Sequence, residues 1–247
     1  MGMNIDFGIA GKKYLVTGAS SGIGHATAIL ISRLGGKVVL NGRNEKRLRE
    51  TLSQMEGDGH YFIPFDLSNL QGISKFIEDC IKGDNLKFDG FVYAAGVINP
   101  TLIKLEDIDN ATKMFKINYY PYIALLKEFS SPKVMNNGGA IVAISSSAAK
   151  FPDKAQAIYA STKAAVDLSS EVAAKEFVKR KIKVNTVRPH ATATPMAANC
   201  FADPEISDRY KLGIIYPEDV AKSIVFLLSD FSSRITGQHI YISGGLF

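Results

Sequence analysis

The stretch Thr17-Gly18-Ala19-Ser20-Ser21-Gly22-Ile23-Gly24 joins the first apolar run, Lys13–Thr17, to the first helical pattern, which begins near Gly22. Three glycines at this spacing do what a dinucleotide site requires. One makes a tight turn, one lets the backbone approach a pyrophosphate, and one permits close packing of a helix on a strand. The free N–H groups at the start of the helix then favour negative charge. A triphosphate-binding P-loop is excluded, because no Lys-Ser or Lys-Thr follows the last glycine.

Outward from this turn, apolar runs typical of strands alternate with helical patterns along the chain. The predicted strands are Lys13–Thr17, Lys37–Leu40, His60–Phe65, Phe88–Tyr93, Ala140–Ile144, Ile182–Val187 and Gln238–Ile242. The predicted helices begin near Gly22 and cover Glu45–Met55, Gln71–Ile81, Ile108–Ser130, Tyr159–Lys179 and Pro217–Leu228. Such alternation predicts right-handed βαβ units. Because we find no repeat and no Pro/Ser-rich linker, we expect one α/β domain over residues 1–247. It is a doubly wound parallel sheet of about seven strands with helices on both faces.

The composition excludes several classes of protein. Of 247 residues, 46% are hydrophobic and 21% are charged, the balance of a soluble globular chain rather than a disordered or fibrous one. No apolar run approaches the roughly 18 residues of a membrane helix. Asp6 and Lys12–Lys13 stand where a signal peptide needs its apolar run. Cys80 and Cys200 are too few for a disulfide framework or a four-ligand zinc site. We therefore expect a cytoplasmic protein with no metal site and no membrane partner.

The positive net charge does not by itself indicate a nucleic-acid partner. It amounts to 29 − 24 = +5, and basic residues have to be clustered to make such a surface. The densest cluster is Lys179-Arg180-Lys181-Ile182-Lys183, where a predicted helix ends. A solvated helix end is the favoured interpretation, because the helix dipole attracts cations there. A docking patch for an anionic partner is the alternative, and we expect no nucleic-acid partner.

The end of the second predicted strand bears on the choice of cofactor. An acid at that position would bind the ribose hydroxyls of NAD and repel a 2′-phosphate. Here the sequence is Asn41-Gly42-Arg43, which has no carboxylate and places a guanidinium two residues after Asn41. Arg43 is able to pair bidentately with a 2′-phosphate, so NADP is expected to be preferred, with NAD still possible. The alternative is a surface arginine in a turn.

Two further segments suggest acid–base chemistry, namely Ser145-Ser146-Ser147 and Tyr159-Ala-Ser-Thr-Lys163. Tyr159 and Lys163 are four apart on a predicted helix, so they share one face. A phenol with a pKa near 10 is a poor acid–base group at neutral pH, but a cation one turn away lowers that pKa. A hydroxyl from the preceding strand end would then donate to a substrate carbonyl oxygen.

Taken together, these motifs resemble the short-chain dehydrogenase/reductase family. They are the Thr-Gly-x-x-x-Gly-x-Gly turn, a serine 159 − 146 = 13 residues before Tyr-x-x-x-Lys, and an asparagine in the helix between. The similarity runs from about Gly11 to the C-terminus and includes Ile242-Ser243-Gly244-Gly245. It implies a Rossmann domain and hydride transfer between nicotinamide and a carbonyl or secondary alcohol. It also implies a homotetramer or homodimer built through the helices that carry Asn118 and Tyr159.

The resemblance assigns roles residue by residue. Ser146 matches the catalytic serine, Tyr159 the general acid/base, and Lys163 the residue that lowers the tyrosine pKa and binds the nicotinamide ribose. Asn118 is similar to the asparagine that holds a proton-relay water beside that lysine. Asp66-Leu67 resembles the adenine-contacting pair, and Thr194 the threonine near the nicotinamide carboxamide. The expected cofactor-binding residues are Gly18, Ser20, Ser21, Ile23, Gly24, Arg43, Asp66, Leu67, Ala94, Ala95, Gly96, Tyr159, Lys163 and Thr194.

Three positions depart from the family pattern. Tyr93-Ala94-Ala95-Gly96 stands where Asn-Asn-Ala-Gly is common, so the contacts that brace the ribose loop must differ. His190 replaces the glycine usual after Pro189. It either narrows the nicotinamide end of the site, contacts substrate, or points outward. Ser21 occupies a position that is often basic in NADP-dependent members, so the NADP preference depends on Arg43 alone.

The sequence thus predicts an NADP(H)-preferring oxidoreductase of small-molecule carbonyls and alcohols. One substrate class is a 3-oxoacyl thioester, whose acyl carrier would dock at the Arg180 region. The alternative is a sugar, polyol or polysaccharide-precursor ketone, because Asn41-Gly42-Arg43-Asn44 resembles stretches in sugar-acid members. A non-catalytic nucleotide sensor is disfavoured, since Tyr159 and Lys163 are both present. The aperiodic segment 195–216 is expected to be a substrate-binding loop that closes over the site.

Overall fold

The computed structural model describes residues 6–201 and 208–246. One sheet contains seven strands in the order β3-β2-β1-β4-β5-β6-β7, and every neighbouring pair is parallel. The strands are β1 (Lys13–Val16), β2 (Lys37–Gly42), β3 (Tyr61–Pro64), β4 (Phe88–Tyr93), β5 (Met135–Ile144), β6 (Lys183–Pro189) and β7 (His239–Ile242). The strand order reverses between β1 and β4. The doubly wound sheet of about seven strands is therefore confirmed.

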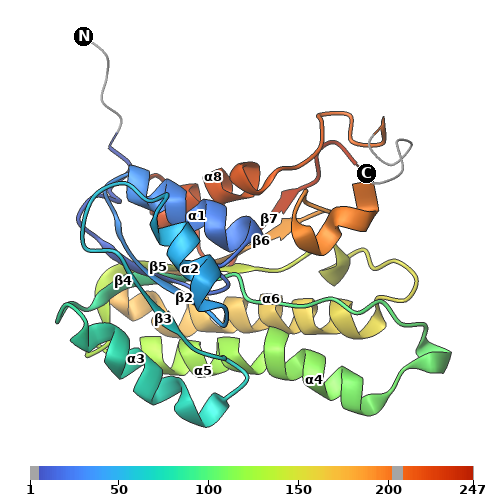
Figure 1. Ribbon diagram of the computed structural model, residues 1–247, viewed down its shortest axis with the longest axis horizontal. Helices are drawn as coiled ribbons and strands as arrows, with labels where there is room; N and C mark the ends of the chain where they lie inside the picture. The colour runs from blue at the N-terminus through green and yellow to red at the C-terminus, as the bar shows by residue number, and fades with distance from the viewer. Residues whose placement is uncertain (1–5, 202–207, 247) are drawn as a thin grey trace.

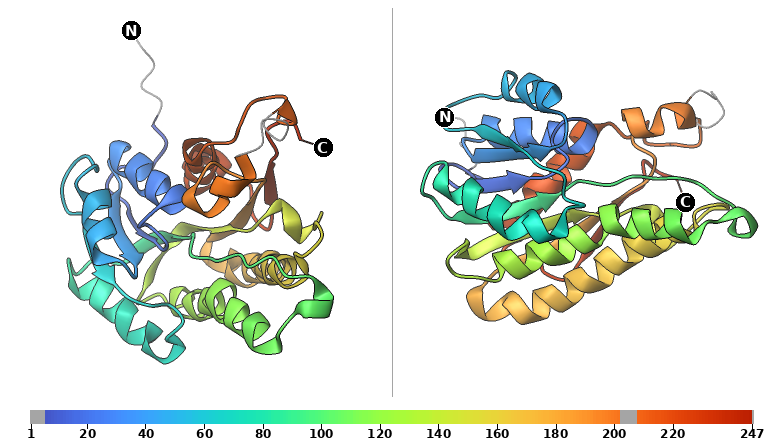
Figure 2. Two further views of the ribbon diagram at one scale, coloured as in Figure 1. Left: turned by 45° about the vertical axis from the view of Figure 1, so that its right-hand side comes forward. Right: turned by 60° about the horizontal axis from the view of Figure 1, so that its bottom comes forward.

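Helices cover both faces of the sheet (Figures 1 and 2). On one face lie α1 (Gly22–Arg33), α2 (Glu45–Leu52) and α8 (Pro217–Leu228), and on the other lie α3 (Ile73–Lys82), α4 (Ile108–Asn118), α5 (Tyr120–Phe129) and α6 (Ala157–Phe177). Strand side chains alternate between the two layers. Val16 and Leu40 pack into the α1–α8 core, whereas Leu15 and Val39 pack into the α3–α5–α6 core. Burial on both faces explains why the strands appear in the sequence as continuous apolar runs.

The single helix expected over Ile108–Ser130 was wrong, because the chain breaks at Tyr119 into α4 and α5. Pro121 lies in the first turn of α5 and has no N–H to donate to the carbonyl of Ile117. That carbonyl instead accepts a hydrogen bond from the phenol of Tyr93, at 2.7 Å. The break is thus stabilised by a residue of β4, which a periodicity argument within the helix does not include.

Two side chains of the basic cluster at residues 179–183 form hydrogen bonds within the protein. The guanidinium of Arg180 donates to the carbonyls of Ser130 (2.7 Å) and Met135 and to the side chain of Asn137 (2.9 Å). The ammonium of Lys183 points inward to Ser229 O and Ser232 Oγ, each at 2.6 Å. The donors of Arg180 are therefore occupied by the chain itself, which weakens the interpretation of this cluster as a docking patch.

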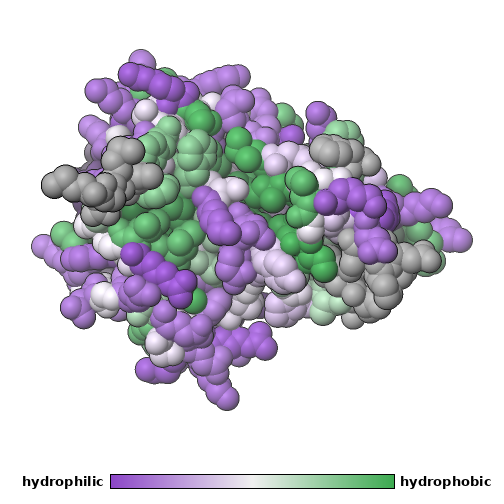
Figure 3. Space-filling view, turned by 90° about the horizontal axis from the view of Figure 1, so that it is seen from above, coloured by the Kyte–Doolittle hydropathy of each residue, from purple (hydrophilic) through white to green (hydrophobic). Residues whose placement is uncertain are grey.

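Across residues 6–201 and 208–246, no helix combines the length and the apolar character needed to cross a bilayer. Viewed from above, the face over α1 and α8 has apolar side chains in its middle and hydrophilic ones around its margin (Figure 3).

Candidate active site

A cavity of about 1570 Å³ is lined by residues from the carboxyl ends of the strands, at the point where the strand order reverses. Open α/β sheets bind ligands at this place. With the exception of Asn118, every residue that the sequence analysis assigned to the site lines this cavity: Gly18, Ser20, Ser21, Ile23, Gly24, Arg43, Asp66, Leu67, Ala94, Ala95, Gly96, Ser146, Tyr159, Lys163 and Thr194. The structure therefore brings together residues that are up to 176 positions apart in the chain (194 − 18).

The glycine turn is shaped by close backbone contacts. Gly18 has a φ of +62°, and a Cβ there would lie 2.8 Å from the main-chain carbonyl of Ala94. A Cβ on Gly24 would lie 2.4 Å from the carbonyl oxygen of Gly18. No side chain caps the start of α1 at Ser21. The first N–H groups of α1 are therefore able to bind an anion in the cavity, as a dinucleotide pyrophosphate requires.

Two arginines and one carboxylate define the end of the cavity beside β2. Arg43 and Arg47 both line it, and Asn44 between them caps α2 by accepting from the Arg47 main-chain N–H at 3.1 Å. Burial acts to raise the pKa of Asp66, but hydrogen bonds from Ser68 and the charge of Arg43 together hold it below its ordinary value. Sequence reasoning missed Arg47, although its position four residues after Arg43, in the first turn of a helix, was an available signal.

Asn41 carries an unpaired acceptor in the same region. Its amide nitrogen donates to the carbonyls of Ile63 and Phe65, at 3.3 and 3.2 Å. Its Oδ1 is buried and has no hydrogen-bond partner in the described part of the chain. An unpaired buried acceptor is costly in a protein, so this atom suits a hydrogen-bond donor of a bound ligand. Together with the bare helix start and the glycine turn, it indicates that the residues present fit a dinucleotide.

The loop after β4 is braced by groups other than the two asparagines common in the related family. Thr17 Oγ1 accepts from the main-chain N–H groups of Ala94 and Ala95, at 3.0 and 3.3 Å. The side chain of Asn118 bonds both the N–H and the C=O of Val97, at 2.8 and 2.9 Å. The loop is therefore held at both ends, although Tyr93-Ala94 replaces the two asparagines.

Ser146, Tyr159 and Lys163 meet where β5 ends and α6 begins. The side chain of Ser146 acts as a hydrogen-bonding partner of the Tyr159 phenol. The ammonium of Lys163 lies 5.9 Å from the centre of the Tyr159 ring and donates to the carbonyl of Ile144 at 2.8 Å. All three side chains line the cavity. A substrate carbonyl group there is therefore able to contact the Ser146 hydroxyl, the Tyr159 phenol and the Lys163 ammonium.

The expected lowering of the Tyr159 pKa by Lys163 does not describe this site. Burial raises the pKa of Tyr159, and the hydrogen bond with Ser146 only partly opposes that effect. Burial also lowers the pKa of Lys163 to about 8, while the charge of Asp167 opposes it. The expected direction for tyrosine was wrong because burial, which depends on packing, sets the shift, and Lys163 is not among the groups that act on this pKa.

Asn118 lies beside this group without lining the cavity. Its amide nitrogen donates to Val97 O and to Thr162 Oγ1, at 2.9 and 3.1 Å, so both hydrogens are used. A Cβ at Gly96 would lie 3.4 Å from Lys163 Nζ and 3.5 Å from Asn118 Oδ1. Because Gly96 has no side chain, the space between these two groups stays open.

The expected substrate loop at 195–216 falls partly outside the described residues, since 202–207, including Pro204, are not described. Its first part, Pro195–Phe201, is 3-10 helical with a kink at Ala197, where the backbone angles are not helical. Thr194, just before it, lies over the glycine turn, with its Cγ2 3.1 Å from the position of a Cβ on Gly22. Arg209 and Tyr210, which follow the undescribed residues in the sequence, also line the cavity.

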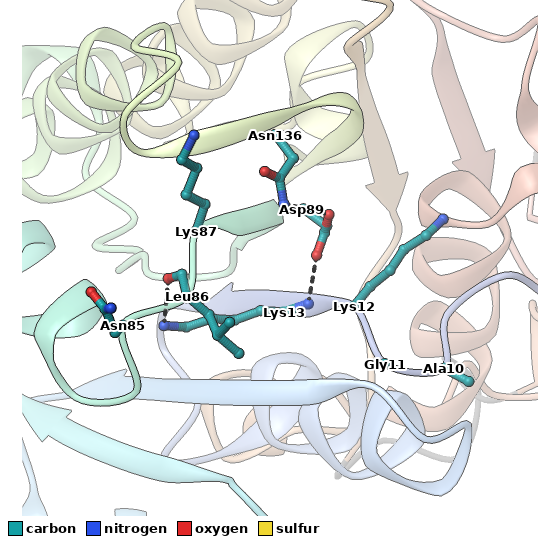
Figure 4. Close-up of a pocket in the computed structure, with 9 residues that line it drawn as sticks. All are labelled: Ala10, Gly11, Lys12, Lys13, Asn85, Leu86, Lys87, Asp89 and Asn136. Carbon is teal, nitrogen blue, oxygen red and sulfur yellow. Dashed lines mark hydrogen bonds between the residues drawn. The ribbon is translucent and has the colours of Figure 1, made fainter.

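A second cavity, of about 570 Å³, lies at the amino ends of the strands, near the starts of β1, β4 and β5 (Figure 4). Its polar groups bond one another. Asp89 accepts from the Lys13 main-chain N–H (2.9 Å) and from Asn136 (3.0 Å), and the ammonium of Lys13 donates to Cys80 O, Leu86 O and Asp84. It is therefore a structural feature. The described residues contain no group of three or more His, Cys, Asp or Glu side chains that would hold a metal ion.

Known proteins resemble this chain over nearly its whole length. The family described as enoyl-(acyl carrier protein) reductase matches residues 18–247. A 3-oxoacyl-[acyl-carrier-protein] reductase FabG of Rickettsia felis is 34% identical over 244 residues, covering 96% of this chain and 98% of that protein. The 2,5-dichloro-2,5-cyclohexadiene-1,4-diol dehydrogenase LinX of Sphingobium indicum is 32% identical over 245 residues, covering 96% of each.

Among solved structures, a 3-ketoacyl-(acyl-carrier-protein) reductase from Brucella melitensis, complexed with NADH, has a similar fold. It superposes with a TM-score of 0.87 at 25% identity, covering 96% of this chain and 98% of that one.

Proposed function

The chain belongs to the short-chain dehydrogenase/reductase family, whose members interconvert CH–OH and C=O groups with NAD(P), and on this basis we propose that it is an NADP(H)-preferring reductase of small-molecule ketones. The observation that carries the proposal is the meeting of Ser146, Tyr159 and Lys163 on one wall of the cavity. These three residues provide a donor, a proton source and a cation at a single point.

The proposed reaction divides the work between the cofactor and the chain. The bound cofactor supplies the hydride. Ser146 holds the substrate carbonyl oxygen by donating a hydrogen bond, and Tyr159 gives its proton to that oxygen as charge develops on it. Burial raises the pKa of Tyr159, so the phenol carries its proton at neutral pH.

Lys163 has two roles in this proposal, to bind the nicotinamide ribose and to return a proton to Tyr159. Both hydrogens of Asn118 Nδ2 are already donated, to Val97 O and Thr162 Oγ1. A relay water at Asn118 would therefore have to bind another atom of this residue. The open space at Gly96, between Lys163 Nζ and Asn118 Oδ1, is where we place that water.

The NADP preference is supported by Arg43 and Arg47, which line the end of the cavity where β2 finishes. Two guanidiniums offer charge-assisted donors to a 2′-phosphate, and no carboxylate occupies Asn41 or Gly42 to repel it. The NADH in the Brucella melitensis structure belongs to a relative at 25% identity, so we treat NAD as the second choice.

Two substrate classes fit the family. A 3-oxoacyl thioester is supported by the FabG relative, but the internal hydrogen bonds of Arg180 weaken the argument for a carrier-docking patch around it. A hydroxylated ketone of the sugar or polyol class is supported by polar side chains on the cavity wall, including Asp153, Gln156 and His190. The segment 195–216 is proposed to cover the substrate, and residues 1–247 to act as one domain.

We also propose a cytoplasmic homotetramer or homodimer. Large apolar side chains are exposed on α5 and α6 and around α8, which is typical of surfaces that pair with another copy. They are Tyr120, Ile123, Leu168, Val172, Phe226 and Phe231, with exposed fractions from 38% to 64%. Light scattering on the purified protein tests the oligomer, and a monomer at micromolar concentration would contradict it.

The function itself is tested by following NADPH oxidation across a panel of 3-oxoacyl thioesters, hydroxylated ketones and steroid ketones. We expect turnover with at least one class, and slower turnover with NADH. Failure of the whole panel, with NADPH binding demonstrated by fluorescence, would reject the proposed reductase activity.

A further inference from the structure

His190 is held in one orientation on the wall of the cavity. It follows the last residue of β6, and its main-chain N–H donates to Ile242 O at 2.9 Å, which anchors it to the end of β7. Its ring is edge-on to Tyr241 (5.8 Å between centres, 80°) and to Tyr210 (6.4 Å, 83°). The ring is half-buried and lines the cavity. His190 therefore does not point outward.

A polar chain links this imidazole to the neighbour of Ser146. Its Nε2 lies 3.3 Å from the hydroxyl of Tyr241, and the side chain of Ser147 is a further hydrogen-bonding partner of that hydroxyl. Tyr241 reaches this position because β6 and β7 pair with Arg188 opposite Tyr241. All three groups line the cavity, and Ser147 is the neighbour of Ser146 in the chain.

One nitrogen of His190 remains available. Burial lowers the pKa of His190, so the ring is neutral at neutral pH and carries one donor and one acceptor nitrogen. The electrostatic influences on the ring come from Asp153, which opposes that lowering, and from Arg209, which adds to it. In the described ranges Nδ1 has no hydrogen-bond partner, and it is absent from the buried unpaired atoms, so it is accessible.

The rest of this wall favours a substrate that carries hydroxyl groups. Asp153 and Gln156 line the same cavity, and the charge of Asp153 acts on His190. A carboxylate oxygen accepts hydrogen bonds, so a substrate hydroxyl is a suitable donor to Asp153. The thioester and acyl chain of a 3-oxoacyl thioester have no such donor. Phe151 and Met196 provide apolar surface for the carbon skeleton.

We propose that His190, oriented by Tyr241, is a specificity-determining residue that hydrogen-bonds a hydroxyl group next to the reacting carbonyl, so that the enzyme selects hydroxylated ketones. This inference rests on the proposed ketone reductase activity and narrows its substrate class. A ketone that lacks the hydroxyl would leave the His190 nitrogen unpaired in the complex. That loss is the physical reason for discrimination between the two ketones.

The test compares a hydroxyketone with the ketone of the same skeleton that lacks the hydroxyl, with NADPH as cofactor. The measured quantity is the ratio of the two kcat/KM values. The substitution His190→Phe keeps the ring and its edge contacts but removes both nitrogens. We expect it to lower the ratio about tenfold, the value of roughly one hydrogen bond. His190→Asn, which restores a donor and an acceptor, should recover much of the preference.

Two results would overturn the inference. One is a wild-type enzyme that favours the ketone without the hydroxyl or an N-acetylcysteamine 3-oxoacyl thioester. The other is an unchanged ratio in His190→Phe, with both rates falling equally, as a purely structural role predicts. A wild-type enzyme that binds NADPH but reduces none of these ketones contradicts the proposed function itself, so the two failures are distinguishable.

Discussion

Lys163 is tied to the end of β5 by two hydrogen bonds, one at its side chain and one at its main chain. Its ammonium donates to Ile144 O at 2.8 Å, and its own carbonyl accepts from Ser145 Oγ at 3.2 Å. These bonds connect α6 to the strand end that bears Ser146. The helix residue and the strand residue of the proposed catalytic group are therefore held in a fixed relation before any ligand binds.

Replacing Tyr159 with phenylalanine removes the proposed proton donor and little else. We expect Tyr159→Phe to fold and to bind NADPH, while kcat for ketone reduction falls by several orders of magnitude. Steady-state kinetics and fluorescence titration of NADPH measure the two effects. A variant that keeps more than about a tenth of the wild-type turnover, with chemistry rate-limiting in both enzymes, rules out this role.

Removing the guanidinium of Arg43 should separate the two cofactors. Arg43→Ala is expected to weaken NADPH binding by about 1.5–3 kcal/mol, because one charge-assisted contact to the 2′-phosphate is lost. NADH binding should stay nearly unchanged. Arg49→Ala is the matched control, since Arg49 is exposed, pairs with Glu45 and does not line the cavity. Equal losses for both cofactors, or no loss, would make Arg43 a surface residue.

Asp167 should raise the pH at which ketone reduction is lost on the alkaline side. Burial lowers the pKa of Lys163 to about 8 and Asp167 opposes that, so removing the carboxylate moves the lysine pKa further down. Because protonated Lys163 resupplies the proton, activity falls as pH rises through this pKa. In Asp167→Asn the alkaline limb of kcat/KM for NADPH, which reports the free enzyme, should shift to lower pH.

The control for this shift is Glu171→Gln, one helical turn further along α6. Glu171 bonds His239 Nε2 at 2.9 Å and does not contribute to the pKa of Lys163. Its pH profile should match that of the wild type. Asp167 also accepts from Thr186 Oγ1 and Arg188 Nε, both at 2.8 Å, so thermal unfolding must be measured alongside. An alkaline limb that stays in place in a folded Asp167→Asn enzyme contradicts the assignment.

Ligands should protect residues 208–216, the second part of the 195–216 segment, from trypsin. Arg209 and Lys211 are exposed, and Arg209 lines the cavity, so cleavage there should be fast in the free enzyme. NADPH with a substrate analogue should slow it, because the segment is proposed to cover the substrate. Lys181, exposed in the turn between α6 and β6, provides the internal control. Equal cutting at Arg209 in both states, with binding demonstrated separately, argues against a covering loop.

Much of the fold was predictable because its signals are local. Alternating apolar runs and helical patterns predicted all seven strands, and the glycine turn identified which strand–helix junction lies at the cavity. Tyr159 and Lys163 were recognisable from their spacing of four residues on one helix. The break at Tyr119 was not predicted, because the group that satisfies Ile117 O comes from Tyr93, twenty-four residues away.

Sequence alone therefore determined the order of the strands, the glycine-rich turn at the cavity and the pair of residues proposed for proton transfer, since each depends on neighbours within a few positions. Tertiary structure decided which distant side chains share the cavity, and so revealed Arg47 beside Arg43 and Tyr241 beside His190. It also reversed the expected direction of the Tyr159 pKa. The physical reason is that desolvation depends on the atoms packed around a group, and those atoms come from strands and helices far apart in the chain.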